Sequence, residues 1–164
     1  MDIKSGLKIL ANCHVELWTA YNEDGSRARD KRGRFARRLK DERWIHNTVT
    51  ALGDAHVADQ MSDKGNAVMG WMAVGTGTPS ATALGTELDR NALTSTTQGT
   101  GGDDNDVIYV GDWAAGDGTG AITEAGIFNA AAAGTMFVSA SFSVINKGAS
   151  DTLKITWTVT FGAT

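Results

Sequence analysis

The fold is decided by one stretch, residues 122–161, which reads ITEAGIFNAAAAGTMFVSASFSVINKGASDTLKITWTVTF. In its last part, apolar residues alternate with polar ones: Leu153, Ile155, Trp157, Val159 and Phe161 against Lys154, Thr156, Thr158 and Thr160. Side chains of a strand point to alternate faces, so this pattern predicts a strand with one buried and one solvated face. We expect three consecutive antiparallel strands, at about 121–128, 135–145 and 151–161.

Further short strands, separated by turn residues, are predicted upstream. They cover residues 7–21, 43–49, 67–74 and 107–113, with a strand or sheet edge at 84–93 and a flexible acidic loop at 94–106. A short helix is predicted at roughly 49–62, capped by Asn47 or Thr48. Its expected inner face holds Val49, Leu52, His56, Val57 and Met61.

Short strands at this spacing favour an all-β, mainly antiparallel fold. We expect a β-sandwich with an N-terminal hairpin or arm and one short helix. The hairpin is placed in residues 1–46 and the sandwich body in residues 47–164. A chain of 164 residues is long enough to bury a core of this kind.

Cysteine content and hydropathy indicate the cellular compartment. Cys13 is the only cysteine, which excludes an intramolecular disulfide and a cysteine-built zinc site. The sequence has no signal-peptide pattern and no apolar run long enough for a membrane span. We therefore expect a protein made and kept in a cytosol, with no membrane partner.

The net charge of −4 conceals a strongly basic run at residues 27–43. Nine basic residues face three acidic ones there, a local charge of +6, which leaves −10 for the rest of the chain. The basic residues are Arg27, Arg29, Lys31, Arg32, Arg34, Arg37, Arg38, Lys40 and Arg43. Their guanidinium and ammonium groups suit an acidic partner. We expect an exposed arm that docks on an acidic neighbouring subunit, with a solvated loop as the alternative.

Nucleic acid is not expected as the partner of this basic run. Aromatic residues are sparse around it, with Phe35 inside and Trp44 just after. The acidic remainder of the chain would repel a phosphate backbone.

The sequence lacks the residue patterns of the common catalytic and cofactor sites. The segment Gly75–Thr78 has no lysine for a phosphate loop, and Cys13 is expected in the core. Glu124 is a lone carboxylate without the second group that acid–base chemistry requires. We expect no enzyme activity, no cofactor and no metal.

Two residue groups leave a metal site open as the weaker alternative. The aspartates are Asp103, Asp104, Asp106, Asp112 and Asp117, and the histidines are His14, His46 and His56. The aspartates lack EF-hand spacing, and His56 with Asp59 forms at most one ligand pair. A solvated loop and structural histidines are the favoured interpretations.

Three groups of motifs lie within residues 47–161. They are NTVT (47–50) with Gly53; MAVGTGT (72–78) with TALGTELDR (82–90); and ITEAGIF (122–128), GTM (134–136), INKG (145–148) and DTL (151–153). In these motifs the chain resembles the structural proteins of tailed-bacteriophage virions, a family that includes capsid decoration (cement) proteins, tail fibres, and collar and baseplate parts. The resemblance implies a β-sandwich virion component without catalysis. The basic run at 27–43 departs from the family pattern.

The resemblance leads to one expected function and two alternatives. We expect a decoration protein that binds and stabilises the shell, with the major capsid protein or other virion proteins as partners. Self-association as a symmetric homo-oligomer, for instance a trimer, and a location in virions assembled in the host cytoplasm follow from the same resemblance. A tail, collar, fibre or baseplate component is the first alternative. A glycan or host-surface binding module using Trp71, Trp113 or Tyr109 is the second, although these aromatic residues are expected in the core.

Overall fold

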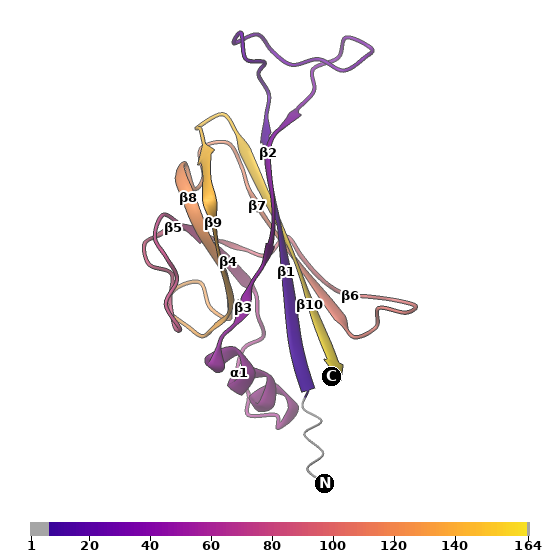
Figure 1. Cartoon of the computed structure of the whole chain (residues 1–164), viewed down its shortest axis with the longest axis vertical. Helices are drawn as coiled ribbons and strands as arrows, with labels where there is room; N and C mark the ends of the chain where they lie inside the picture. Colours follow the sequence, from indigo (N-terminus) through magenta and orange to yellow (C-terminus); the bar gives the residue numbers. More distant parts are fainter. Residues whose placement is uncertain (1–6, 164) are drawn as a thin grey trace.

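The long alternating strand forms as predicted and lies at the centre of a sheet. In the computed structural model, which describes residues 7–163, it is β10 (Thr152–Ala163) (Figure 1). Leu153, Ile155, Trp157 and Val159 are buried, while Lys154 on the opposite face is exposed. One face of this strand therefore supplies the core and the other meets solvent.

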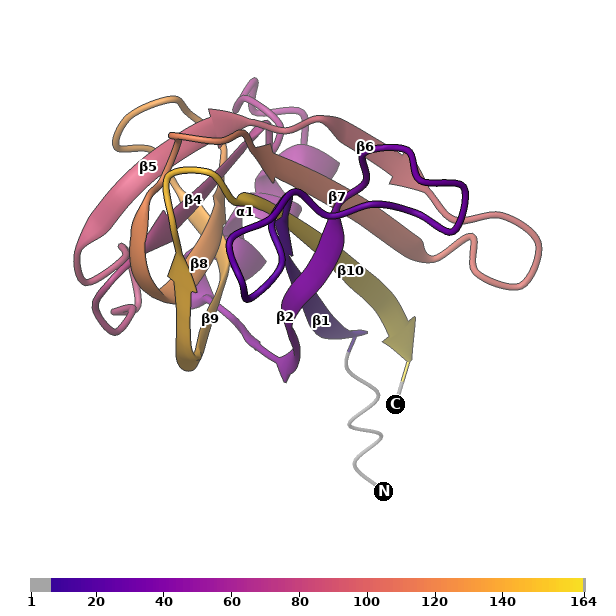
Figure 2. The ribbon, with the colours of Figure 1, turned by 90° about the horizontal axis from the view of Figure 1, so that it is seen from above.

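Two antiparallel sheets of five strands each pack face to face, which confirms the predicted all-β sandwich (Figure 2). The first sheet has the order β2 (Arg38–His46), β1 (Leu7–Thr19), β10, β7 (Asp106–Trp113) and β6 (Ser95–Gln98). The second has the order β3 (Thr48–Val49), β9 (Met136–Lys147), β8 (Gly120–Phe128), β4 (Trp71–Gly75) and β5 (Glu87–Ala92). The predicted single helix is α1 (Ala51–Met61).

The final three strands do not all pair with one another. β8 and β9 form an antiparallel pair, but β10 lies between β1 and β7 in the other sheet. The turn at residues 148–151 therefore carries the chain from one sheet to the other. Alternation of apolar residues predicts a strand but does not say which sheet it joins.

The N-terminal hairpin belongs to the first sheet. β1 pairs with β10 from Leu7↔Ala163 to Trp18↔Thr152, and Cys13, Val15 and Leu17 point into the same core as Trp157. The described residues of 1–46 and of 47–164 thus share one sheet and one core. The burial of Cys13, as predicted, also raises the pKa of its thiol.

Two strand predictions need correction. The return strand of the hairpin begins at Arg38, five residues before the predicted start at Arg43. The predicted loop at 94–106 contains β6, an edge strand paired with β7. All four residues of β6, Ser95 to Gln98, are exposed, so the strand has no apolar face that a sequence pattern could reveal.

The helix is confirmed, but its cap and its inner face differ from the prediction. Thr50 caps α1 by accepting a hydrogen bond from the Gly53 N–H (2.9 Å). The same hydroxyl donates to the Met136 carbonyl (2.6 Å), which fastens the helix to β9. Gly53 and His56 are the buried residues of α1, whereas the predicted inner residues Leu52 and Met61 are exposed.

Gly53 is required by the close approach of α1 to β9. A Cβ at this position would lie 2.7 Å from Phe137 Cδ2 and still closer to the Phe137 carbonyl oxygen. The absence of a side chain therefore lets the helix sit on the strand. None of the helices in the described residues is long and apolar enough to cross a bilayer.

Gly53→Ala is expected to lower the free energy of unfolding by about 2 kcal/mol or more, because an added methyl group would push α1 away from β9. Urea unfolding of the variant and the parent chain measures the difference. Gly102→Ala is the matched control, because a Cβ there meets nothing within 4 Å and φ is not in the left-handed region. Equal losses in both variants would contradict the packing role of Gly53.

Candidate functional site: the projecting arm

The projecting arm, residues 20–37, continues the β1–β2 hairpin beyond the sandwich (Figure 1). Two tight turns form it. The Asn22 carbonyl accepts a hydrogen bond from the Gly25 N–H (3.0 Å), and the Asp30 carbonyl accepts one from the Gly33 N–H (2.9 Å). Gly25 and Gly33 have φ values of 80° and 76°, a region that favours glycine. Local sequence thus specifies both turns.

Asp30 holds the second turn closed. One carboxylate oxygen accepts hydrogen bonds from the backbone N–H groups of Arg32 (2.8 Å) and Arg34 (3.0 Å). The other accepts one from Arg34 Nε (2.8 Å). The Arg34 guanidinium and these backbone bonds hold the pKa of Asp30 below its ordinary value of 3.8. The arm therefore uses one of its own carboxylates, and one of its guanidinium groups, to fix its shape.

Backbone hydrogen bonds join the two turns to the root of the arm. The Ala28 N–H donates to the Ala20 carbonyl (2.9 Å), and the Ala36 N–H donates to the Ala28 carbonyl (3.0 Å). Ala28 is buried although the arm around it is exposed. A small side chain lets the strands of the arm approach each other here.

Phe35 is an exposed aromatic ring with two guanidinium groups beside it. Its side chain is 63% exposed. The guanidinium carbon of Arg29 lies 4.4 Å from the ring centroid, and that of Arg27 lies 5.1 Å from it. Arg27 also lies 5.4 Å from the ring centroid of Tyr21. Cation–π contacts of this kind keep the arginines beside the ring.

The structure divides the nine predicted basic residues into two groups. Those on the projecting arm are Arg27, Arg29, Lys31, Arg32, Arg34 and Arg37, and those on β2 are Arg38, Lys40 and Arg43. Among the described residues, the arm makes one ion pair, between Arg34 and its own Asp30. In the β2 group, Arg38 donates to the Tyr21 carbonyl of the arm (2.9 Å), whereas Lys40 and Arg43 contact the sandwich.

Lys40 and Arg43 close an open edge of the second sheet. β3 pairs with only Val138 and Ser139 of β9, which leaves the rest of that edge without a strand partner. Arg43 Nε donates to the Ser143 hydroxyl (2.8 Å), and the Arg43 guanidinium is held by Asp41. Lys40 Nζ lies 2.5 Å from Asp151 Oδ2. These long side chains cover an edge that could otherwise pair with another chain.

Lys147 and Asp151 are both buried, and the exposed Lys40 side chain pairs with Asp151. Lys147 Nζ donates to the carbonyls of Ala114 (3.0 Å) and Asp151 (2.9 Å). Burial lowers the pKa of Lys147, against the opposing effect of nearby aspartates. For Asp151, burial acts to raise the pKa, but hydrogen bonds from Lys40 and the Gly148 N–H hold it below 3.8. These contacts fix the turn that joins the two sheets.

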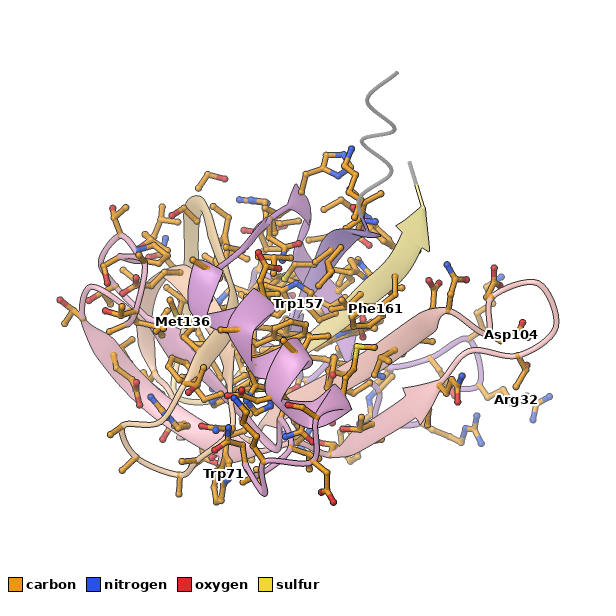
Figure 3. All side chains as sticks on the ribbon, turned by 90° about the horizontal axis from the view of Figure 1, so that it is seen from below. Arg32, Trp71, Asp104, Met136, Trp157 and Phe161 are labelled. Atoms are coloured by element: carbon orange, nitrogen blue, oxygen red, sulfur yellow. The ribbon has the colours of Figure 1, made fainter. Side chains whose placement is uncertain are left out.

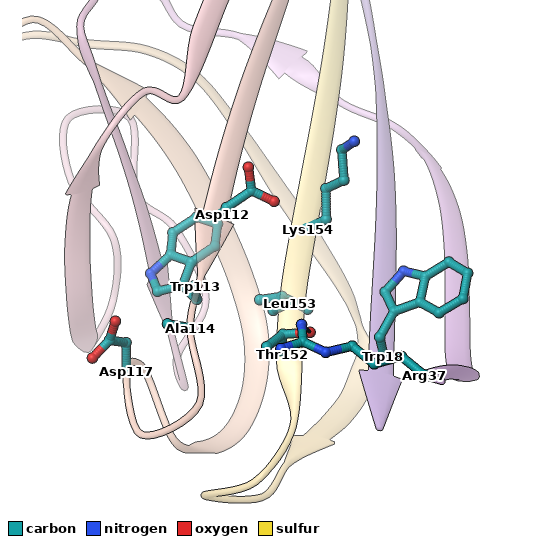
Figure 4. Close-up of a pocket in the computed structure, with 9 residues that line it drawn as sticks. All are labelled: Trp18, Arg37, Asp112, Trp113, Ala114, Asp117, Thr152, Leu153 and Lys154. Atoms are coloured by element: carbon teal, nitrogen blue, oxygen red, sulfur yellow. Dashed lines mark hydrogen bonds between the residues drawn. The ribbon is translucent and has the colours of Figure 1, made fainter. Parts of the chain in front are cut away.

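A hollow of about 480 Å³ lies at the root of the arm (Figure 4). Trp18 and Trp113 lie on either side of β10, with Thr152 between them. Arg37 donates a hydrogen bond of 2.7 Å to the Thr152 hydroxyl and so joins the arm to the first sheet. Aspartate and basic side chains both line this hollow, so its rim favours neither sign of charge.

Glu124 is the residue whose role sequence reasoning missed. Its buried carboxylate accepts hydrogen bonds from the N–H groups of Gly77 (2.9 Å), Gly85 (2.8 Å) and Thr86 (2.8 Å). Three charge-assisted bonds of this kind fold the loop between β4 and β5 onto β8. A lone carboxylate in a sequence gives no sign of such partners, because all three are backbone groups distant in the chain.

Glycines make room for this arrangement. A Cβ at Gly75 would lie only 2.5 Å from Glu124 Oε1. A Cβ at Gly85 would lie 2.5 Å from the Thr78 carbonyl oxygen. The motifs at 72–78, 82–90 and 122–128 therefore meet in space around one carboxylate. The guanidinium carbon of Arg90, from the second motif, lies 3.7 Å from the centroid of the Phe128 ring. The same guanidinium donates hydrogen bonds to the carbonyls of Ala130 and Ala133 (both 2.9 Å).

The other candidate groups are dispersed. Asp103, Asp104 and Asp106 lie at the opposite end of β7 from Asp112 and from Asp117 beyond it. Within residues 7–163, no three or more His, Cys, Asp or Glu side chains are grouped so that they could hold a metal ion. Trp113 and Tyr109 are buried, as predicted for core residues. Trp71 is half-buried.

Asp151→Asn is expected to lower the free energy of unfolding by about 3 kcal/mol at neutral pH, because Lys40 loses its ion-pair partner and the buried Lys147 loses a nearby negative charge. The pKa of Asp151 is depressed in the folded state, so its contribution is complete above pH 3.8 and is lost as pH falls through the folded pKa. Urea unfolding across the acid range measures this. The difference in free energy of unfolding between the parent chain and the variant should narrow only below about pH 4.

Asp104→Asn is the control for this comparison. Asp104 is exposed, so its substitution should change stability by no more than about 0.5 kcal/mol at any pH. The contradicting result is a difference in free energy of unfolding between parent and D151N that stays constant to the lowest pH at which both chains fold.

In comparisons with known proteins, the chain matches no family model, no curated protein and no solved structure.

Proposed function

We propose that the chain is a non-enzymatic structural protein of a tailed-bacteriophage particle, in which it decorates the shell and stabilises it through subunit contacts. The projecting arm is the contact element. The observation that carries this proposal is the arm itself, a folded basic projection that extends beyond both sheets. Its partner is an acidic surface of a neighbouring virion subunit.

The charges of the arm support this assignment. Lys31 and Arg32 lie in the second turn, and both are exposed. The described residues offer neither side chain an ion-pair partner. A fixed backbone that presents such cations binds an acidic surface with less loss of conformational entropy than a flexible tail would.

The sandwich supports the proposal in a second way. The conspicuous charged residues of the resemblance motifs, Glu124, Arg90 and Lys147, all make internal contacts that hold loops and turns. These three residues therefore serve the fold. A rigid body with one specialised projection suits a protein used in many copies on a lattice, where modest contacts combine.

Lys31→Ser with Arg32→Ser is expected to weaken binding to empty shells of the parent particle by about tenfold at physiological salt, because two interfacial cations are lost. Co-sedimentation of the chain with shells measures this. The matched control is Lys8→Ser with Lys154→Ser, which removes the same charge from exposed positions on the first sheet. The control should bind like the parent chain.

Equal weakening by the two double variants would mean that net charge, and not the arm, governs binding. Replacement of residues 21–36 by Asn-Gly removes the arm while keeping β1 and β2, because Asn-Gly closes tight hairpins. Undiminished shell binding by this shortened chain would overturn the role of the arm. Failure of the intact chain to bind shells would overturn the decoration function.

Copy number distinguishes the shell from the other parts of the particle. A decoration protein covers the shell in a fixed ratio to the major capsid protein, whereas a tail, collar or baseplate part is present in few copies. Gel densitometry of purified particles measures the ratio. A ratio of a few copies per particle would replace the decoration function with a tail, collar or baseplate role.

A further inference from the structure

The two ends of the molecule carry opposite charge. The arm stands at one end of the long axis and α1 at the other (Figure 1). Asp54, Asp59 and Asp63 lie in or next to α1, and Asp103, Asp104 and Asp106 lie at the start of β7 and in the loop before it. The cations toward this end are Lys64, which pairs with Asp59 at 3.4 Å, and Lys8, opposite Gly162 near the end of β10. A basic end and an acidic end favour contact between copies in head-to-tail order.

The acidic end also contains an apolar hollow. It has a volume of about 210 Å³ and lies between α1, the segment at Val68 and Met69, and the end of the sandwich near Phe161. Figure 3 shows α1 across this end of the molecule, with Phe161 beside it. Met61 and Val68 on its rim are 81% and 70% exposed. Apolar side chains left this exposed around a hollow are typical of an interaction site.

The loop between β6 and β7, which carries Asp103 and Asp104, bonds to the end of β10 at one side of this hollow. The Asn105 carbonyl accepts a hydrogen bond from the Phe161 N–H (2.9 Å), and the Asn105 side chain donates to the Phe161 carbonyl (2.8 Å). Asp104 and Asp106 therefore flank Asn105, which bonds the backbone of Phe161, a residue of the lining. Asp59 lies on the other side, on α1 next to Gln60 of the lining.

Phe35 of the arm has the shape and the surroundings to fill such a hollow. A cavity of about 150 Å³ accommodates a benzene ring, so 210 Å³ is sufficient for a phenyl side chain. Arg27 and Arg29 lie beside the Phe35 ring, where they would meet the acidic rim as the ring entered. The Phe35 region of the arm and the hollow at α1 thus match in both shape and charge.

We propose that the arm of one copy inserts Phe35 into the α1 hollow of a second copy, with Arg27 and Arg29 against the acidic rim. This contact deepens the proposed function, on which it rests, by identifying a second copy of this chain as a partner of the arm. The two surfaces differ, so the contact is heterologous and repeats around a ring or along a row.

Cross-linking of purified chains tests the contact. A size-tagged Ala36→Cys chain, which keeps Phe35 and places a thiol next to it, is mixed with a Val68→Cys chain and treated with a bis-maleimide. Cys13 does not interfere, because its thiol is buried. The control mixture uses Val144→Cys, a valine that is also exposed but lies on β9 and does not line the hollow. We expect several-fold more heterodimer with V68C than with V144C, and equal yields or no heterodimer would overturn the contact.

Sedimentation velocity provides a second readout without engineered cysteines. Phe35→Ala should weaken self-association by about tenfold or more, because it removes the central apolar anchor. Trp44→Ala, which alters another exposed aromatic residue, should leave it unchanged. High salt should weaken the association of the parent chain. Self-association that is insensitive to F35A would overturn the proposal.

These assays contain no shells, so they separate this contact from the proposed function. Parent shell binding together with no A36C–V68C product would overturn the contact and leave the decoration function standing. Loss of shell binding by F35A, again without that product, would assign Phe35 to a shell protein instead of a second copy. Failure of shell binding by the intact chain would overturn the proposed function, whatever the cross-linking result.

Discussion

The pairing of β1 with β10 is the constraint on which the rest of the structure depends. These two strands run side by side from Leu7↔Ala163 to Trp18↔Thr152, and each aims one face at the core. The ladder joins the first described strand to the last, so it forms only when most of the chain is present. β2 pairs with the outer edge of β1, and the arm leaves the sheet where these strands end. The direction of the arm is therefore set by the ladder.

A second constraint acts inside the other sheet. In place of water, the Glu124 carboxylate accepts hydrogen bonds from three backbone N–H groups of a loop that has few apolar side chains. A buried carboxylate is costly unless its oxygens are satisfied, so the loop and the glutamate need each other. The same logic applies to Lys147 at the turn between the sheets. The motifs at 72–78, 82–90, 122–128 and 145–148 thus have a physical role as determinants of the fold.

Sequence patterns predicted those parts of the molecule in which local periodicity reflects burial. The alternation in β10 and the turn residues around the strands sufficed for the sandwich, and the helix was expected within two residues of each of its ends. β6 escaped prediction because Ser95–Gln98 are exposed on both faces. Thr50 was missed as the cap because its position depends on β9 as well as on the helix: its hydroxyl donates to the Met136 carbonyl while it accepts from the Gly53 N–H. The basic run was found by charge alone, but the division of its members between the arm and β2 depends on long-range contacts such as Lys40 with Asp151.

The account depends most on the arm being a folded element that the sandwich holds in place. Residue-resolved amide hydrogen exchange of the full chain measures this directly. The N–H groups of Ala28, Asp30, Gly33 and Ala36 donate backbone hydrogen bonds within the arm, so they should exchange about tenfold or more slowly than that of Lys31 in the same turn. Exchange of all five at the rate of an unstructured peptide would contradict the account.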